Sequence, residues 1–208
     1  MALTSRQQLF SLVRNGDSPF EGDWDVNLLI REIEENLGAV VTDIPFVYNG
    51  SNDYGIHVRL SRPPDIVARI ARGDINMPEY DRFPIQEQIP EVEFEVVVYK
   101  LLRSAPDIPV SRLLYYRIPQ QHTGPQLDRP SDIVGRRLLV FERAEGEKNI
   151  WRDLSAEQMA CLLAQSARIR ASLFDFQLSL EFAAALLHKR IFTTGRLHAS
   201  CQLSCPIL

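Results

Sequence analysis

The sequence contains little cysteine, no long apolar run and no excess of basic charge. Its three cysteines, Cys161, Cys201 and Cys205, are an odd and sparse set, which argues against a disulfide scaffold and indicates a reducing compartment. No apolar run approaches the ~18 residues that a membrane helix needs, and the first residues lack the basic-then-apolar pattern of a secretory signal. We therefore expect a cytoplasmic protein without a membrane partner.

The charge balance and the spacing of metal-ligand residue types argue against two further functions. The net charge is −4, from 23 basic and 27 acidic residues, so a sequence-independent nucleic-acid surface is not expected. His198, Cys201 and Cys205 are residues of metal-binding type, but their spacing matches no common zinc pattern. We therefore predict neither a nucleic-acid partner nor a metal site.

The periodicity of apolar residues predicts helices first and strands after them. The chain has 208 residues, 45% of them hydrophobic, enough to bury a sizeable core as one large domain or two small ones. Residues 4–14 and 25–37 have apolar side chains at helical spacing, and Gly38 ends the second segment. Short β-branched segments at 39–47, 54–60 and 66–71 are separated by turn-forming residues and predict an antiparallel meander.

The rest of the sequence adds one inserted helix and two more strands. Residues 73–90 hold three prolines and are predicted to form a loop, with Pro90 as the first residue of a helix that runs to Leu102. Strands are predicted at 112–118 and at 138–141, the second of them buried on both faces. Ser155 to Gln158 is a capping-box pattern that begins another helix, and a further helix is predicted at 180–192. This order is typical of an α+β fold with an antiparallel sheet.

The turn between the first two predicted strands is a candidate phosphate-binding loop. It runs from Asn49 through Gly50 and Ser51 to Gly55. Its two glycines would let backbone N–H groups approach phosphate oxygens closely. A plain hairpin turn has the same composition and remains the alternative interpretation.

Arg69 and Glu95 are the two candidate charged site residues. Arg69 is a charge within the apolar strand at 66–71, and Glu95 flanks the apolar stripe of the inserted helix, so that it could point towards this strand. Taken singly, each residue has an ordinary alternative: a solvated arginine on a half-buried strand and a solvated carboxylate on a helix. Their occurrence together, in this order along the chain, is what a kinase-like nucleotide-binding lobe requires.

Several stretches between Ile44 and Phe174 resemble the aminoglycoside phosphotransferase family in its fungal protein-kinase-like form. "DIVARIARGD" resembles the third strand of the family, where arginine often replaces the lysine of protein kinases. "EVEFEVVVYKLLRSAPDIPVSRLLYY" resembles the helix that carries the glutamate and the entry to the fourth strand. "RRLLVFERAEGEKNIWRDLSAEQ" resembles the hinge strand, the glycine that ends the hinge, and the following helix.

The resemblance implies a fold, a cofactor and roles for named residues. Residues 39–146 would form a protein-kinase-like N-lobe, a five-stranded antiparallel sheet plus one inserted helix. This lobe would follow an N-terminal helical segment at 1–38 and precede the first helices of an incomplete helical C-lobe at 147–195 and a disordered tail at 196–208. The cofactor would be ATP with Mg²⁺. Arg69 would clamp the nucleotide phosphates, Glu95 would orient Arg69, and the backbone of Glu142, Arg143 and Ala144 would face the adenine.

The sequence lacks the motifs that carry out phosphoryl transfer in this family. Transfer needs a carboxylate that accepts the hydroxyl proton and ligands for Mg²⁺, which the family supplies from a His-Gly-Asp-type loop and a later aspartate. None of the four histidines begins a His-x-Asp triplet, and we interpret Phe174-Asp175-Phe176 as the end of a helix. We therefore expect a protein truncated before its catalytic lobe. It would have no catalytic residue, and it would phosphorylate a small-molecule hydroxyl only if that lobe is supplied.

Two alternatives to an ATP-dependent phosphotransferase remain open. One is a non-catalytic nucleotide-binding or interaction module, and the other is a truncated, non-functional fragment. In a fragment, the helices after Ser155 would expose an apolar face, with Leu162, Leu163, Leu186 and Leu187 as candidate exposed positions. Such a face predicts self-association.

Overall fold

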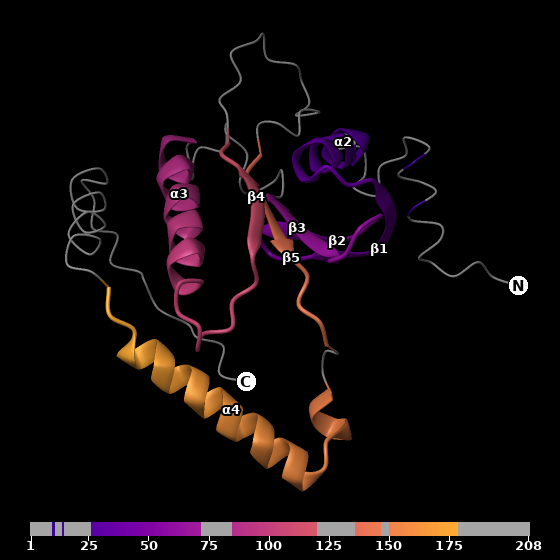
Figure 1. Ribbon diagram of the computed structural model, residues 1–208. Helices are drawn as coiled ribbons and strands as arrows, with labels where there is room; N and C mark the ends of the chain where they lie inside the picture. Colours follow the sequence, from indigo (N-terminus) through magenta and orange to yellow (C-terminus); the bar gives the residue numbers. More distant parts are fainter. Residues whose placement is uncertain are drawn as a thin grey trace, which may run out of the picture.

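The computed structural model describes Phe10, Arg14 and residues 26–71, 85–119, 136–146 and 150–178. These residues form an α+β fold, an open five-stranded antiparallel sheet with three α-helices and one 3-10 helix (Figure 1). In chain order the elements are α2 (Val26–Leu37), β1 (Val41–Asn49), β2 (Asp53–Leu60), β3 (Ile66–Ala71), α3 (Ile85–Leu102), β4 (Leu113–Arg117), β5 (Leu138–Glu142), η2 (Ile150–Asp153) and α4 (Ala156–Asp175).

The predicted α+β class and antiparallel sheet are confirmed, and each of the five strands lies within two residues of its expected bounds. Some predictions fall outside the described residues. These are most of the helix at 4–14, the helix at 180–192 with Leu186 and Leu187, and the tail with His198, Cys201 and Cys205.

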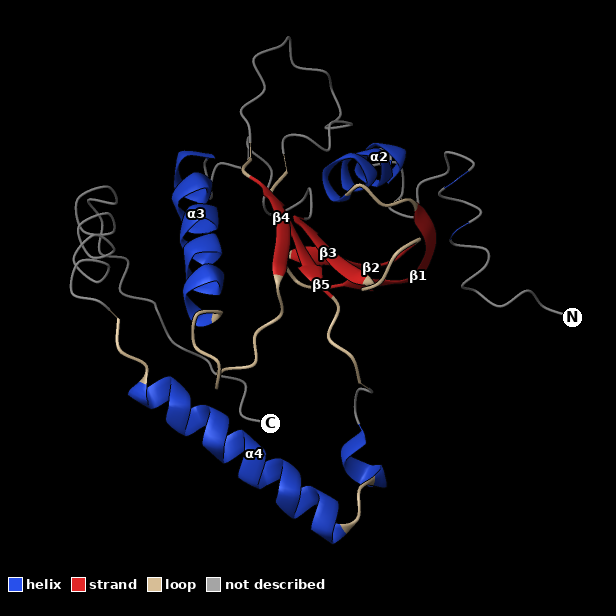
Figure 2. Ribbon diagram, in the orientation of Figure 1, coloured by secondary structure: helices blue, strands red, loops and turns tan. Residues whose placement is uncertain are grey.

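The five strands form one sheet in the order β1-β2-β3-β5-β4 (Figure 2). Every neighbouring pair is antiparallel, and the register places Arg69 of β3 between Gly55 of β2 and Leu139 of β5. The first three strands form the predicted meander, with β1 at one edge. Pro45 lies in β1 where the register shifts between Asp43 and Phe46, because a proline cannot donate to the ladder and is tolerated at a sheet edge.

Each face of the sheet has its own apolar core, because successive strand residues point to opposite faces. On one face α2 packs its apolar stripe against the central strands, and on the other face α3 packs Val92 and Val96 against Leu139 and Phe141. The core on the α2 side contains Val26, Leu29, Ile30, Ile33, Ile56, Ile66, Ala68, Ile70 and Val140. Since Ala68 and Ile70 belong to the α2 side, Arg69 between them belongs to the side of α3.

Helix α3 begins five residues earlier than the sequence predicts. Pro90 was expected to be its first residue, with a loop before it, but the helix starts at Ile85 and Pro90 lies inside it. The preference of proline for the first helical turn favoured the later start. Burial explains why the helix starts earlier. Gln88 and Val92, on either side of Pro90, are at most 1% exposed, so the packing of this turn outweighs the hydrogen bond lost because Pro90 has no N–H.

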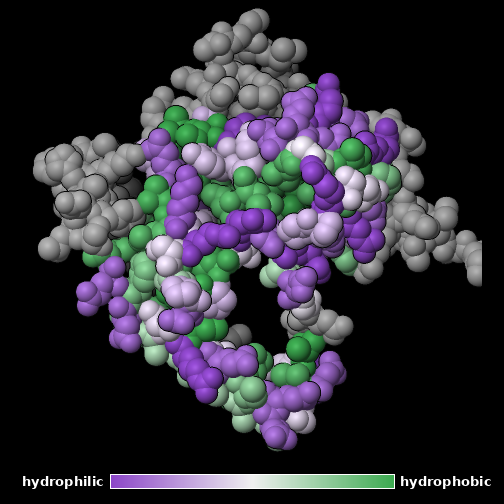
Figure 3. All heavy atoms as spheres, in the orientation of Figure 1, coloured by the Kyte–Doolittle hydropathy of each residue, from purple (hydrophilic) through white to green (hydrophobic). Residues whose placement is uncertain are grey.

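Helix α4 extends away from the sheet. It begins with the predicted capping box, in which the Ser155 hydroxyl accepts from the Gln158 amide and the Gln158 side chain accepts from the Ser155 amide. It ends at Asp175, which confirms the interpretation of that segment as a helix end. No residue of α4 is buried, and an open space separates it from the sheet (Figure 3). None of the described helices has the length and apolar character needed to cross a membrane.

Candidate functional site

Arg69 and Glu95, the two charged residues predicted to meet, form an ion pair between β3 and α3. The Arg69 Nη1 donates to Glu95 Oε1 at 2.9 Å. Strand alternation turns Arg69 towards α3, and Glu95 lies between Val92 and Val96, the residues through which α3 packs on the sheet. The Arg69 guanidinium also lies 5.9 Å from the centre of the Phe141 ring, a cation–π distance.

Two residues that the sequence did not single out, Asp53 and Arg137, complete this cluster. The Asp53 Oδ2 accepts from Arg69 Nη2 at 2.9 Å, and its Oδ1 accepts from Arg137 Nη2 at 3.0 Å and from Arg137 Nε at 3.3 Å. Asp53 and Arg137 are the more enclosed pair, with side chains 15% and 13% exposed, whereas Arg69 is 35% exposed. One carboxylate therefore joins two guanidinium groups, one from β3 and one from the residue before β5.

The surroundings keep the Arg69 guanidinium charged. Burial alone would lower the pKa of Arg69, but the hydrogen bond to Asp53 and the negative charges of Glu95 and Asp53 outweigh it, and the pKa is raised. Burial also raises the pKa of Tyr99, one turn after Glu95 on α3, and the Glu95 carboxylate adds to this effect. The cluster thus holds two fixed positive charges, two carboxylates and a neutral phenol at physiological pH.

The predicted phosphate-binding turn is a tight hairpin whose first glycine serves the turn itself. The Gly50 amide donates to the Asp53 carbonyl at 2.9 Å, so it is not available to a phosphate. A Cβ at Gly50 would lie 2.8 Å from that carbonyl oxygen, which explains the glycine without a ligand. Gly55 lies in β2 and pairs with Arg69 of β3. A Cβ at Gly55 would make only ordinary van der Waals contacts with Tyr48. Ser51 lies exposed at the tip of the turn, and Asn49, the last residue of β1, pairs with Tyr54.

The predicted hinge, residues 142–144, begins with the last residue of β5, and two of its amides already donate hydrogen bonds within the protein. The Glu142 amide donates to the Arg112 carbonyl and the Arg143 amide donates to the Asp65 carbonyl, both at 2.8 Å. The Glu142 carboxylate pairs with Arg112 Nε at 3.0 Å. These bonds hold residues 142 and 143 to the residues directly before β4 and β3. Ala144 is the first residue beyond them.

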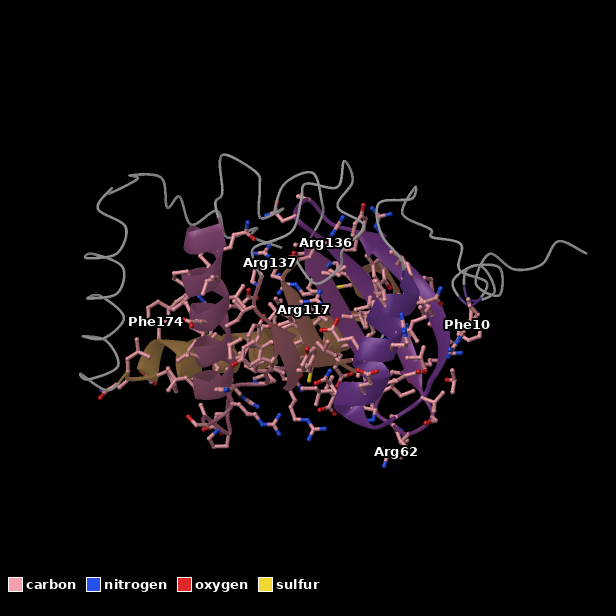
Figure 4. All side chains as sticks on the ribbon, turned by 90° about the horizontal axis from the view of Figure 1, so that it is seen from above. Phe10, Arg62, Arg117, Arg136, Arg137 and Phe174 are labelled. Atoms are coloured by element: carbon pink, nitrogen blue, oxygen red, sulfur yellow. The ribbon has the colours of Figure 1, made fainter. Side chains whose placement is uncertain are left out.

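A second polar cluster, on the α2 side of the sheet, has the character of a structural network. Tyr115 Oη donates to Glu32 Oε1 at 2.8 Å, and the Arg117 guanidinium pairs with the other Glu32 oxygen. Burial and this hydrogen bond raise the pKa of Tyr115 to about 12. Arg117 Nε donates to the Arg136 carbonyl at 3.1 Å. These arginines and Arg137 lie between α2 and α3 (Figure 4).

The described residues do not by themselves form a set of metal ligands. No group of three or more His, Cys, Asp or Glu side chains in the described part of the chain could hold one. Asp53 and Glu95, the carboxylates of the cluster, both accept hydrogen bonds from Arg69. Mg²⁺ usually keeps several waters and is bound through one or two carboxylates, and both carboxylates of this cluster are already hydrogen-bonded to an arginine.

No protein-family model, curated protein or solved structure matches this chain.

Proposed function

We propose that residues 39–146 form a nucleotide-binding lobe of the protein-kinase-like type, and that the chain binds Mg-ATP. The observation that carries the proposal is the 2.9 Å ion pair between Arg69 on the third strand and Glu95 on the helix inserted before the fourth. In protein kinases a cation on the third strand pairs with a glutamate of the inserted helix and holds the nucleotide phosphates. Arg69 would take this role here, within the resemblance to aminoglycoside phosphotransferases.

The position of Arg69 supports a ligand role over a purely structural one. Its side chain is 35% exposed, so a phosphate can reach it from solvent. A guanidinium has five donors in a planar fork and binds phosphate oxygens in pairs. Two of its nitrogens are engaged by Glu95 and Asp53, and exchange of the Asp53 carboxylate for a phosphate would conserve the charge pairing.

The hydrogen bonds of the hinge amides limit which backbone N–H group could bind adenine. Glu142 and Arg143 use their N–H groups within the protein. Of the three hinge residues, Ala144 is then the candidate that offers its backbone amide to the base. Gly146, with a positive φ of 124°, ends this segment and allows the chain to turn away towards η2.

We further propose that this chain binds the nucleotide without transferring phosphate. The sequence contains no His-x-Asp triplet, and the two carboxylates of the described cluster are paired with arginines, so neither of these two is placed to accept a hydroxyl proton. A small-molecule hydroxyl would become a substrate only with a catalytic lobe supplied separately. This favours a non-catalytic nucleotide-binding module as the activity of this chain.

Thermal unfolding of the full chain with and without Mg-ATP tests the proposal. A ligand at ~100 times its dissociation constant adds roughly 2.7 kcal/mol to the stability of the native state, a readily measured shift. Arg69→Gln should lose the shift and Glu95→Gln should reduce it. Arg59→Gln, on neighbouring β2 with an exposed guanidinium paired to Asp43, is the matched control and should keep it. A parent that unfolds cooperatively without any shift would overturn the proposal.

A further inference from the structure

We propose that Arg69 and Arg137 together form a binding site for a chain of phosphates, and that the Asp53 carboxylate occupies this site as an intramolecular competitor. The proposal deepens the nucleotide-binding function above and rests on it for the identity of the natural ligand. It adds Arg137 as a second phosphate-binding residue and Asp53 as the group that a ligand must displace.

The hydrogen bonds of Asp53 suit such a competitor. Each carboxylate oxygen goes to a different arginine, Oδ2 to Arg69 and Oδ1 to Arg137, at 2.9 and 3.0 Å. Two guanidinium groups from β3 and from the residue before β5 therefore converge on one anion. Two adjacent non-bridging oxygens of a polyphosphate present the same pair of acceptors, and charge-assisted bonds of this kind are the strong ones in proteins.

The charges of the cluster mean that Asp53 and a polyphosphate cannot bind the two arginines at the same time. Arg69 and Arg137 carry two positive charges, balanced by Asp53 and Glu95. A polyphosphate that kept Asp53 in place would meet a carboxylate among its ligands and would be repelled. With the Asp53 side chain withdrawn, Arg137 would lose its acceptors, and a phosphate would replace them.

The place of Asp53 at the very start of β2 lets its side chain turn away while the strand keeps its pairing. It is the first residue of β2, next to the exposed residues of the β1–β2 turn. The buried apolar residues of β2 begin with Tyr54, the next residue, and continue with Ile56 and Val58. Rotation of the Asp53 side chain alone, with the backbone still paired to Ala71, would free both guanidinium groups.

Binding of inorganic tripolyphosphate without Mg²⁺ to the full chain, measured by titration calorimetry, tests the inference separately from the nucleotide function. Asp53→Asn should bind tripolyphosphate about tenfold more tightly than the parent, because one charged competing interaction is removed. Arg137→Gln in the Asp53→Asn background should abolish this gain. Asp43→Asn, which removes a carboxylate paired with Arg59 on the same hairpin, should leave the affinity unchanged.

The outcomes separate the two proposals. A gain in Asp53→Asn with equal affinity for tripolyphosphate and ATP would support the phosphate site while counting against recognition of adenine. Unchanged or weaker binding in both Asp53→Asn and Asp53→Ser would overturn the inference, even if the parent binds Mg-ATP. Loss of cooperative unfolding in both variants would also overturn it, since Asp53 would then be an obligatory clamp rather than a displaceable anion.

Discussion

At the scale of single residues, His57 is a buried imidazole that the fold holds neutral. It is 5% exposed, stacks on Phe46 and contacts Asp65 Oδ2 through Nε2 at 3.0 Å. Burial lowers the pKa of His57 from its ordinary 6.5, and although Asp65 opposes this effect, Arg143 and Arg59 add to it. The neutral ring donates its Nε2 proton to Asp65, which directly precedes β3.

The lowered pKa of His57 predicts a loss of stability on acidification. In the unfolded chain the imidazole takes up a proton near pH 6.5, while in the native state it remains neutral to a lower pH. Stability from this group is therefore complete above pH 6.5 and is lost as the pH falls from there through the native pKa. Urea unfolding from pH 7.5 to 5.0 measures this, and His57→Gln should flatten that part of the profile. An equal pH dependence in both proteins would contradict the prediction.

The candidate site was half predictable from the sequence. Arg69 interrupts an apolar strand and Glu95 flanks an apolar helical stripe, so both could be identified from local alternation alone. In the sequence Asp53 has the character of a turn residue. It lies two residues before Gly55, which pairs with Arg69, so Asp53 and Gly55 are on the same face of β2. Arg137 could not be found, because it comes near Asp53 only through the pairing of β5 with β3, which joins segments about seventy residues apart.

At the scale of elements, the position of Pro90 inside α3 predicts that replacing this proline stabilises the protein. A proline at the first position of the helix would predict no such gain. Proline lacks the N–H that bonds to the carbonyl four residues earlier, and it costs about 3 kcal/mol in a helix interior. Because α3 starts at Ile85, Pro90→Ala should restore this bond and raise the free energy of unfolding by about 1–3 kcal/mol. Urea unfolding followed by circular dichroism measures the change.

Pro106, which lies after the end of α3, provides the matched control for this substitution. Pro106→Ala should leave the stability unchanged or slightly lower, since no helical bond is gained there and the unfolded chain becomes freer. If Pro90→Ala behaved in the same way, Pro90 would be the first residue of the helix, as its sequence neighbourhood suggests, and the turn at residues 85–89 would not be helical in solution.

The elements themselves were more predictable than their arrangement. Apolar alternation, turn residues and the capping box located α2, α4 and all five strands, because these signals act within a few residues. The order β1-β2-β3-β5-β4 places β5 between β3 and β4. No local signal specifies this insertion; it depends on Leu139 and Phe141 being covered by α3 on one face while Leu138 and Val140 pack beneath α2 on the other.

At the scale of the whole molecule, the described residues divide into a packed sheet with two helices and an unpacked arm. Leu162, Leu163 and Leu173 of α4 are 40%, 52% and 46% exposed. Phe174, at the far end of the arm, is 81% exposed (Figure 4). The exposure expected at Leu162 and Leu163 is therefore confirmed, and self-association through this face remains a prediction.

A pair of identical substitutions tests whether the sheet folds independently of this arm. Leu139→Ala, in β5 and 2% exposed, should cost about 2–5 kcal/mol because it removes buried methyl groups and leaves a cavity. Leu163→Ala, in α4, should change the unfolding of the sheet by no more than about 0.5 kcal/mol. Denaturant unfolding monitored by the tyrosines of the sheet, at two protein concentrations, measures both.

A cost above about 2 kcal/mol for Leu163→Ala would mean that α4 is covered in solution. If that cost grew with protein concentration, a second copy of the chain would be what covers it, since a dimer is stabilised by mass action.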